Sequence, residues 1–159
     1  MESKQLMVKM ALDGWNGYLS RTSKVFEELS DEQLAKEVSP GRNTGVYLLG
    51  HLVAVHDTMI ALLGLGDKLY PQLEMPFIKS PDKSGLVFPP IAELRTYWNE
   101  TNKRLEQYFA ALSADDWFMK HTAINEEDFA KEPHRNRLNV LLSRTSHLAS
   151  HYGQIVFLK

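Results

Sequence analysis

Apolar residues recur along four long segments of the chain at alternating spacings of three and four positions. Such spacing places one apolar stripe along one face of a helix. In the segment from about residue 4 to 29, the stripe consists of Val8, Leu12, Trp15, Leu19, Thr22, Phe26 and Leu29. The segments from about 46 to 63, about 91 to 112 and 137 to 159 repeat apolar residues in the same way. We therefore predict four long helices.

Local signals mark the starts of several predicted elements. Asn43 or Thr44 is placed to cap the second long helix. The double proline ending at Pro90 suits the start of the third, because proline is tolerated in the first helical turn. Ser30 and Ser113 are each followed by acidic residues, a pattern that favours a short capped helical turn.

Two long connections separate the predicted helices. Residues 67–90 hold five prolines and show no clean period, and residues 121–136 are mostly polar. Helices that each carry one apolar stripe are expected to bury those stripes against one another. The pattern therefore predicts an all-α fold, a four-helix bundle that forms a single domain over residues 1–159. Connections of this length also allow sequential helices to lie parallel.

Composition narrows the functional classes. Hydrophobic residues make up 43% of the 159-residue chain, and the formal net charge is −2, so there is no electrostatic case for binding nucleic acid or an anionic membrane. The chain has no cysteine, which excludes disulfides and thiolate metal ligands and fits a reducing cytoplasm. We find no signal peptide and no apolar stretch approaching the roughly 18 residues of a membrane span.

Histidines carry the most informative pattern. His147 and His151 lie four residues apart on the last predicted helix, so both imidazoles occupy the same face and can share one ion. His51 and His56 flank the apolar stripe of the second helix, and periodicity alone does not choose between them as a partner. Two further histidines, at positions 121 and 134, lie in the polar connection and are interpreted as solvated.

Three histidines and a water form the ligand set of an open zinc-type site, in which the vacant position accepts substrate. Neutral imidazole also suits nickel, iron and copper. The helical His-Glu-x-x-His motif of metalloproteases and the Glu-x-x-His repeats of di-iron bundles are both absent. The alternative interpretation is that the closely spaced histidines serve packing and hydrogen bonding.

The run from His147 to Ile155, HLASHYGQI, resembles the signature of the DinB/YfiT-like superfamily, whose final helix carries His-x-x-x-His followed by x-Gly-Gln. The stretch LLGHL, from Leu48 to Leu52, is similar to that superfamily's second-helix motif, whose histidine is the third metal ligand. The resemblance implies an up-down-down-up bundle, frequent homodimers and a divalent ion, often nickel or zinc. Matched residue by residue, it selects His51 rather than His56 to join the two histidines of the last helix.

The resemblance also suggests a chemistry. Members are described as metal-dependent hydrolases, and some relatives are thiol-dependent transferases or isomerases. An ion with an open position polarises a carbonyl and lowers the pKa of bound water toward ~7. We therefore predict a metal-dependent enzyme that hydrolyses, or transfers a thiol to, a small organic substrate. The alternative is a non-catalytic bundle that binds a small molecule or partner and keeps a vestigial or structural metal site.

The sequence departs from the superfamily pattern at Tyr152, where many members have arginine. Arg144 lies three residues before His147 and is a candidate to supply that positive charge instead. Tyr47 and Gln154 are further polar neighbours of the predicted site, and Gln154 either orients a ligand or supports packing. None of these residues is identified as a general base, so the catalytic residues stay unassigned.

Outside these motifs the sequence predicts structural roles. Trp15, Trp98 and Trp117 are expected in the core or at an interface. Gly14 and Gly17 each weaken the first helix by roughly 1 kcal/mol relative to alanine. They either permit close approach of a neighbouring helix or a ligand, or add flexibility alone. Exposed remnants of the apolar stripes on the first and last helices are candidates for a homodimer contact.

Overall fold

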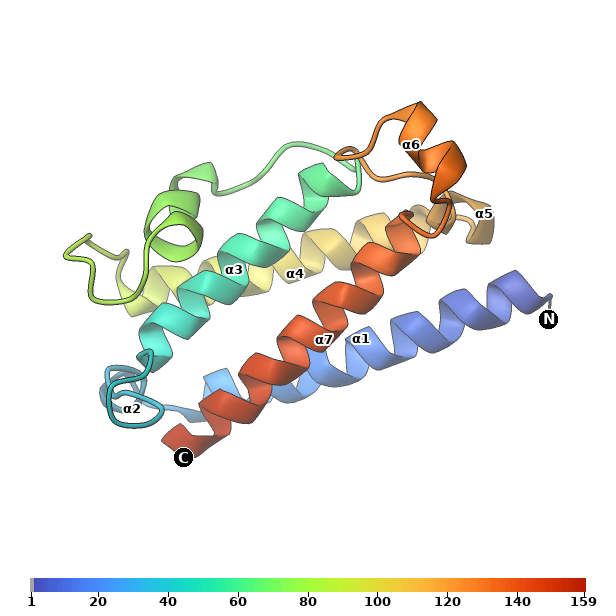
Figure 1. Cartoon of the computed structure of the whole chain (residues 1–159). Helices are drawn as coiled ribbons and strands as arrows, with labels where there is room; N and C mark the ends of the chain where they lie inside the picture. The colour runs from blue at the N-terminus through green and yellow to red at the C-terminus, as the bar shows by residue number, and fades with distance from the viewer. Residues whose placement is uncertain (1) are drawn as a thin grey trace.

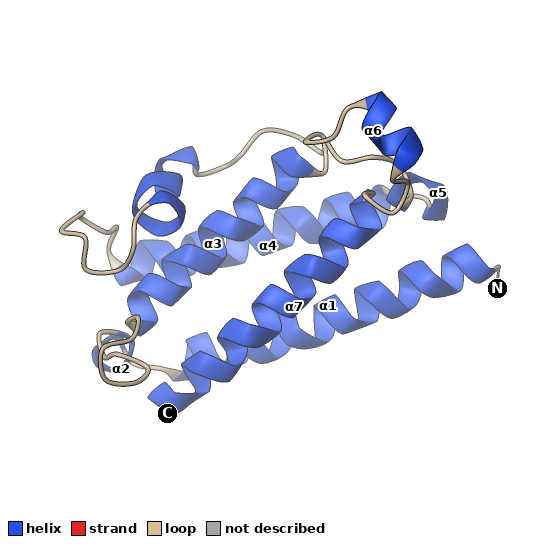
Figure 2. Cartoon of the chain, viewed as in Figure 1, coloured by secondary structure: helices blue, strands red, loops and turns tan. Residues whose placement is uncertain are grey.

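The computed structural model describes residues 2–159, which form helices joined by turns and loops (Figure 1). Its four long helices are α1 (Ser3–Glu28), α3 (Gly45–Leu62), α4 (Ile91–Ala111) and α7 (Arg137–Ile155). No strand occurs within this described part of the chain (Figure 2). The predicted all-α fold class is therefore confirmed, and each long helix lies where apolar periodicity placed it.

The four helices pack mainly as two pairs, α1 along α7 and α3 along α4 (Figure 1). Lys159, just beyond α7, forms an ion pair with Glu28 at the end of α1. Arg95, near the start of α4, donates a hydrogen bond of 2.7 Å to the carbonyl oxygen of Leu29. The helices α1 and α7 therefore end at the same end of the molecule, where α3 and α4 begin.

The core lies between these pairs and includes all three tryptophans. Trp15, Trp98 and Trp117 are buried, as predicted. The most deeply buried long helix is α3, which is apolar along its 18 residues. By length and composition alone this helix is long and apolar enough to cross a membrane, which corrects our expectation from the sequence. Because 72% of these 18 residues are buried inside the molecule, α3 has the burial of a core helix in a soluble protein.

Side-chain caps fix the starts of three elements. Ser30 caps the short helix α2 (Asp31–Leu34), Ser113 caps α5 (Ala114–Trp117), and Thr44 rather than its neighbour caps α3. In each case the side-chain oxygen accepts a backbone N–H of the first turn, a group that has no partner inside the helix. These caps bear out the local signals in the sequence.

The two connections are more ordered than the sequence indicated. Residues 67–90 contain the 3-10 turn η1 (Pro71–Leu73) and the one-turn π-helix η2 (Met75–Lys79). Residues 121–136 contain the short helix α6 (Glu126–Lys131). Elements of one turn are too short to show a period, so apolar spacing did not predict them. Asp57 of α3 holds the first connection by accepting two backbone N–H groups, at 2.7 and 2.9 Å.

The glycines of α1 do not serve close packing within the chain. A Cβ added at Gly14 or Gly17 would meet no atom within 4 Å. Of the two interpretations offered by the sequence, close approach of a neighbouring helix is therefore wrong within this chain.

Candidate metal centre

Three histidines from two helices converge between α3 and α7. His51 projects from α3, and His147 and His151 project from successive turns of α7. The Nε2 atom of His147 lies 3.1 Å from Nε2 of His51 and 3.1 Å from Nε2 of His151. The ligand nitrogens of all three residues lie within 4.8 Å of one another. The structure thus brings together the three histidines that the sequence selected.

His51 is held from the side facing away from the other histidines. Its Nδ1 donates a hydrogen bond of 2.6 Å to the carbonyl oxygen of Phe77 in η2. Tyr47, one turn earlier on α3, stacks nearly parallel to the imidazole, with 6.0 Å between ring centroids and 11° between planes. A carbonyl oxygen only accepts hydrogen bonds, so the proton lies on Nδ1 and Nε2 presents a lone pair.

His151 is oriented in the same manner from its own helix. Its Nδ1 donates a hydrogen bond of 2.7 Å to Oε1 of Gln154, one turn further along α7. Its Nε2 therefore also presents a lone pair toward His147. An acceptor on the second nitrogen of a metal-binding histidine fixes the tautomer and raises the basicity of the ligand. Both Gln154 and Phe77 occupy that role.

The nitrogen arrangement fits a divalent ion. If Nε2 of His147 carries a proton, that proton can bond to only one of the two lone pairs that face it, on Nε2 of His51 and Nε2 of His151. The other lone pair then has no hydrogen-bond donor within the cluster. A cation that accepts all three lone pairs resolves this conflict. Two nitrogens each about 2.1 Å from one ion lie about 3.0–3.4 Å apart at angles between right-angled and tetrahedral. The two separations of 3.1 Å that involve Nε2 of His147 fall in this range.

Burial keeps these imidazoles in the neutral form that binds metals. Desolvation, together with the positive charge of His151, His51 and Arg144, lowers the pKa of His147 to about 4. Burial is also the leading cause that lowers the pKa of His51 and of His151. At neutral pH all three nitrogens are therefore free to act as ligands without first losing a proton.

The other predicted polar neighbours occupy different positions around the centre. The hydroxyl of Tyr47 donates a hydrogen bond of 2.8 Å to the carbonyl oxygen of Ser80, so it supports the fold. Tyr152 packs edge-on against Tyr18 of α1, with 6.2 Å between ring centroids. Arg144 is half-buried, and its Nε has no hydrogen-bond partner in the described chain.

The remaining histidines lie outside the centre. His56 is fully buried between Trp15 and Trp98, and its Nδ1 donates a hydrogen bond of 2.8 Å to Oδ1 of Asn102. It is therefore a core residue and not the third member of the cluster. His121 is partly exposed and His134 is exposed.

Sequence reasoning missed the carbonyl group that orients His51. Backbone atoms leave no trace in residue type, and η2 carries no periodic pattern. One indirect signal exists in Gly50, the residue before His51. A Cβ at that position would lie 2.3 Å from the ring of Phe77, so only glycine allows η2 to pack against this turn of α3.

Comparison with known proteins places this helical chain in a family. Residues 18–155 match the DinB superfamily. The chain belongs to this superfamily, and its three-histidine group is consistent with a metal site. The predicted resemblance is therefore confirmed.

A solved structure supports the fold over the whole chain. The chain is similar to the crystal structure of a conserved protein from Enterococcus faecalis, with a TM-score of 0.62 and 15% sequence identity. The match covers 99% of this chain and 95% of that one. No curated protein sequence matches the chain.

Proposed function

We propose that the protein is a metal-dependent enzyme that acts on a small organic substrate through a divalent ion, nickel or zinc, held by His51, His147 and His151. One observation carries the proposal: Nε2 of His147 lies 3.1 Å from Nε2 of His51 and 3.1 Å from Nε2 of His151, while the opposite nitrogens of His51 and His151 are held by acceptors. Such fixed outer hydrogen bonds are typical of histidines that bind a metal.

The donor set favours electrophilic chemistry. A divalent ion with an open position polarises a carbonyl group and activates bound water near neutral pH, which supports hydrolysis, and it also orients a thiolate for transfer. All three donors are neutral, so the chain does not diminish the charge of the ion. Phe77 and Gln154 hold two of the rings in place, which limits reorganisation during a reaction.

A non-catalytic bundle with a vestigial or structural ion is the second candidate function. It is favoured by the absence of an acidic side chain from the cluster, which contains only histidines among the described residues. A carboxylate is a common general base in metal-dependent hydrolases, and none is part of this cluster.

Metal analysis of the purified protein tests the centre itself. We expect one equivalent of nickel or zinc per chain in the parent and almost none in the His147→Ala/His151→Ala variant. His134→Ala, which removes an exposed histidine, is the matched control and should retain the metal. Absence of binding at saturating metal, or equal binding by the double variant, rules out the proposal.

Activity separates the two candidate functions once metal binding is established. We expect nickel- or zinc-dependent turnover in a panel of esters, amides and electrophilic thiol acceptors. The His147→Ala/His151→Ala variant should lose that turnover. A metal-loaded protein that converts no substrate of the panel would favour the non-catalytic bundle.

A further inference from the structure

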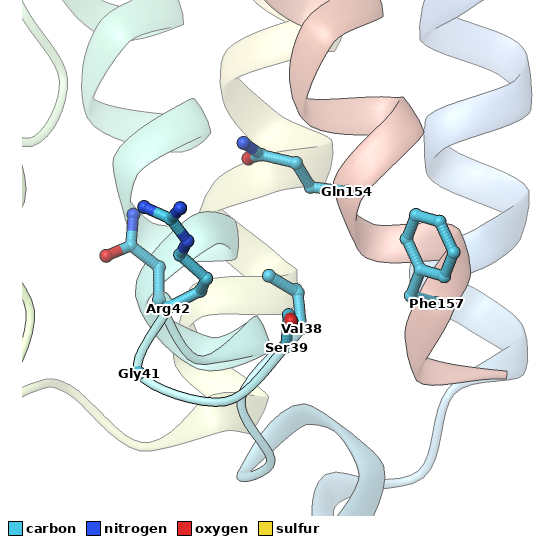
Figure 3. Close-up of a pocket in the computed structure, with 7 residues that line it drawn as sticks. Val38, Ser39, Gly41, Arg42, Gln154 and Phe157 are labelled. Atoms are coloured by element: carbon cyan, nitrogen blue, oxygen red, sulfur yellow. The ribbon is translucent and has the colours of Figure 1, made fainter.

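A cavity of about 480 Å³ is lined in part by Gln154, the residue that accepts a hydrogen bond from His151. Figure 3 shows its lining residues. The cavity lies between the loop that precedes α3 and the C-terminal turns of α7. Its walls consist of Val38, Ser39, Gly41, Arg42, Asn43, Gln154 and Phe157. A volume of this size suits a small organic molecule, since ligand pockets typically measure about 300–1,000 Å³.

One residue belongs to both the cavity and the centre. The side chain of Gln154 lines the cavity, and its Oε1 accepts the hydrogen bond of 2.7 Å from Nδ1 of His151. In Figure 3 the amide of Gln154 extends from α7 toward the α3 side of the cavity. A molecule seated in the cavity therefore lies one side chain away from a proposed metal ligand.

Arg42 is the only charged residue that lines this cavity. Within the described chain its guanidinium forms no ion pair, because the acidic residues near it already have partners. The carboxylate of Glu37 pairs with Lys83 and accepts the backbone N–H of Gly41 at 2.7 Å. The carboxylate of Asp82 accepts from the backbone and the hydroxyl of Thr44, at 2.6 and 2.8 Å. A full positive charge thus remains available to a ligand.

The loop that carries Arg42 is well fixed. The backbone N–H of Arg42 donates to the carbonyl oxygen of Ser39 at 2.9 Å, and its own carbonyl accepts from Lys83 at 3.2 Å. Gly41 adopts a φ of 75°, a left-handed conformation that favours glycine and completes the turn. The backbone of Arg42 is therefore ordered before any ligand arrives, which lowers the entropy cost of binding.

We propose that this cavity binds the carboxylate group of a small organic acid and thereby selects the substrate of the metal centre, an inference that rests on the proposed function. The planar guanidinium of Arg42 matches a carboxylate in a two-pronged hydrogen bond, and the amide of Asn43 adds a donor beside it. Val38 and Phe157 contact the apolar body of the acid. Gln154 guides the uncharged end toward the histidines.

The charge of the cavity favours a carboxylate over a phosphate monoester. A single cation faces the ligand, whereas a phosphate carries nearly two negative charges at neutral pH. The start of α3 does not supply the missing donors, because Thr44 caps its first turn and is itself bonded to Asp82. One planar cation and neutral amides together suit one planar monoanion.

Ligand titration by NMR tests the inference with 3-phenylpropionate as the probe. Its uncharged amide and phenyl phosphate serve as comparison probes. We expect 3-phenylpropionate to bind the metal-free parent protein more tightly than either comparison probe. Arg42→Gln should weaken its binding by about tenfold or more, since a hydrogen bond to a charged group is lost. Arg42→Lys should recover part of the affinity, because the charge returns without the planar fork.

Arg104→Gln is the matched control, because it removes the same charge from an exposed position on α4 that is not among the lining residues. It should bind 3-phenylpropionate like the parent. Equal affinity in Arg42→Gln and the parent overturns the inference, as does equal or tighter binding of the amide or the phosphate.

Metal content of the same samples keeps the two proposals apart. Arg42→Gln should hold as much zinc as the parent, since Arg42 is not a ligand. A parent that binds neither nickel nor zinc overturns the proposed function, while titration of the metal-free protein still reports on the cavity alone. If the parent binds zinc but its affinity for 3-phenylpropionate does not depend on Arg42, the proposed metal centre is retained and the carboxylate assignment is overturned.

Discussion

At the scale of single residues, two histidines of α3 show how burial and partners decide a role. His51 is partly buried. Its Nδ1 donates a hydrogen bond to the carbonyl oxygen of Phe77, and its Nε2 faces Nε2 of His147. His56 is fully buried, donates from Nδ1 to Asn102, and leaves Nε2 without a partner. A second proton on His56 would place an unpaired charge in the core, which is costly. His56 is therefore a neutral structural residue.

The protonation of His56 predicts a pH dependence of stability. Burial lowers its pKa from 6.5 to about 3 in the folded protein. The unfolded chain therefore binds more protons between these two values, and the free energy of unfolding falls as the pH drops below 6.5. The contribution of this residue to the slope is about 1.4 kcal/mol per pH unit. His56→Gln, which keeps a donor for Asn102, should flatten the slope between pH 6 and 4.5.

Urea unfolding of metal-free protein at several pH values provides the measurement. His134→Gln is the control, since its side chain is exposed, and it should leave the slope of the parent unchanged. A slope for His56→Gln that equals that of the parent would show that His56 is not the neutral buried group described above.

At the scale of elements, the one-turn π-helix η2 links loop packing to the metal centre. Its residue Phe77 is fully buried against α3, and its carbonyl oxygen accepts from His51. The contact exists because Gly50 leaves room for the ring. A substitution that displaces η2 should therefore also loosen the orientation of His51. Hydrogen bonds to the second nitrogen of a metal-binding histidine commonly affect metal affinity.

Gly50→Ala tests this link. Alanine normally stabilises a helix interior by roughly 0.5–1 kcal/mol relative to glycine. Here the new methyl group would lie 2.3 Å from the Phe77 ring, and such overpacking typically costs about 1–3 kcal/mol. We expect a net loss of stability in thermal unfolding and weaker zinc binding in a chelator competition. Gly14→Ala, where the space is open, should be neutral or stabilising and leave zinc binding unchanged. Unchanged zinc affinity in Gly50→Ala would show that the packing of η2 does not affect metal binding.

Elements differ in how much the sequence could predict of them. Each long helix extends over five or more turns, so its apolar stripe repeats often enough to be recognised. A single turn such as η2 repeats nothing, and its role depends on a backbone carbonyl. The i, i+4 spacing of His147 and His151 fixed their shared face in advance. Their partner on α3 depended on how two helices meet, and periodicity left His51 and His56 open.

At the scale of the whole molecule, the centre joins the two helix pairs. His51 belongs to the α3–α4 pair, and His147 and His151 belong to the α1–α7 pair. The resemblance to a superfamily could select the three residues from the sequence. It could not show the carbonyl oxygen behind His51 or the cavity beside Gln154, because these depend on loops whose packing leaves no periodic signal.

Removal of the metal should weaken the contact between the two helix pairs without unfolding the protein. The core is a continuous cluster that includes all four long helices, so hydrophobic burial alone should maintain the fold. A ligand at 100 times its dissociation constant adds about 2.7 kcal/mol to stability. For a domain of this size that corresponds to a melting temperature about 5–10 °C higher.

We therefore expect chelation of the zinc-loaded protein to lower the melting temperature by about this amount while the far-ultraviolet circular dichroism at 25 °C keeps its helical form. The His147→Ala/His151→Ala variant should melt at the same temperature with and without chelator, because it has no ion to lose. Loss of helical signal on chelation at 25 °C would show instead that the ion holds the two helix pairs together and that its role is structural.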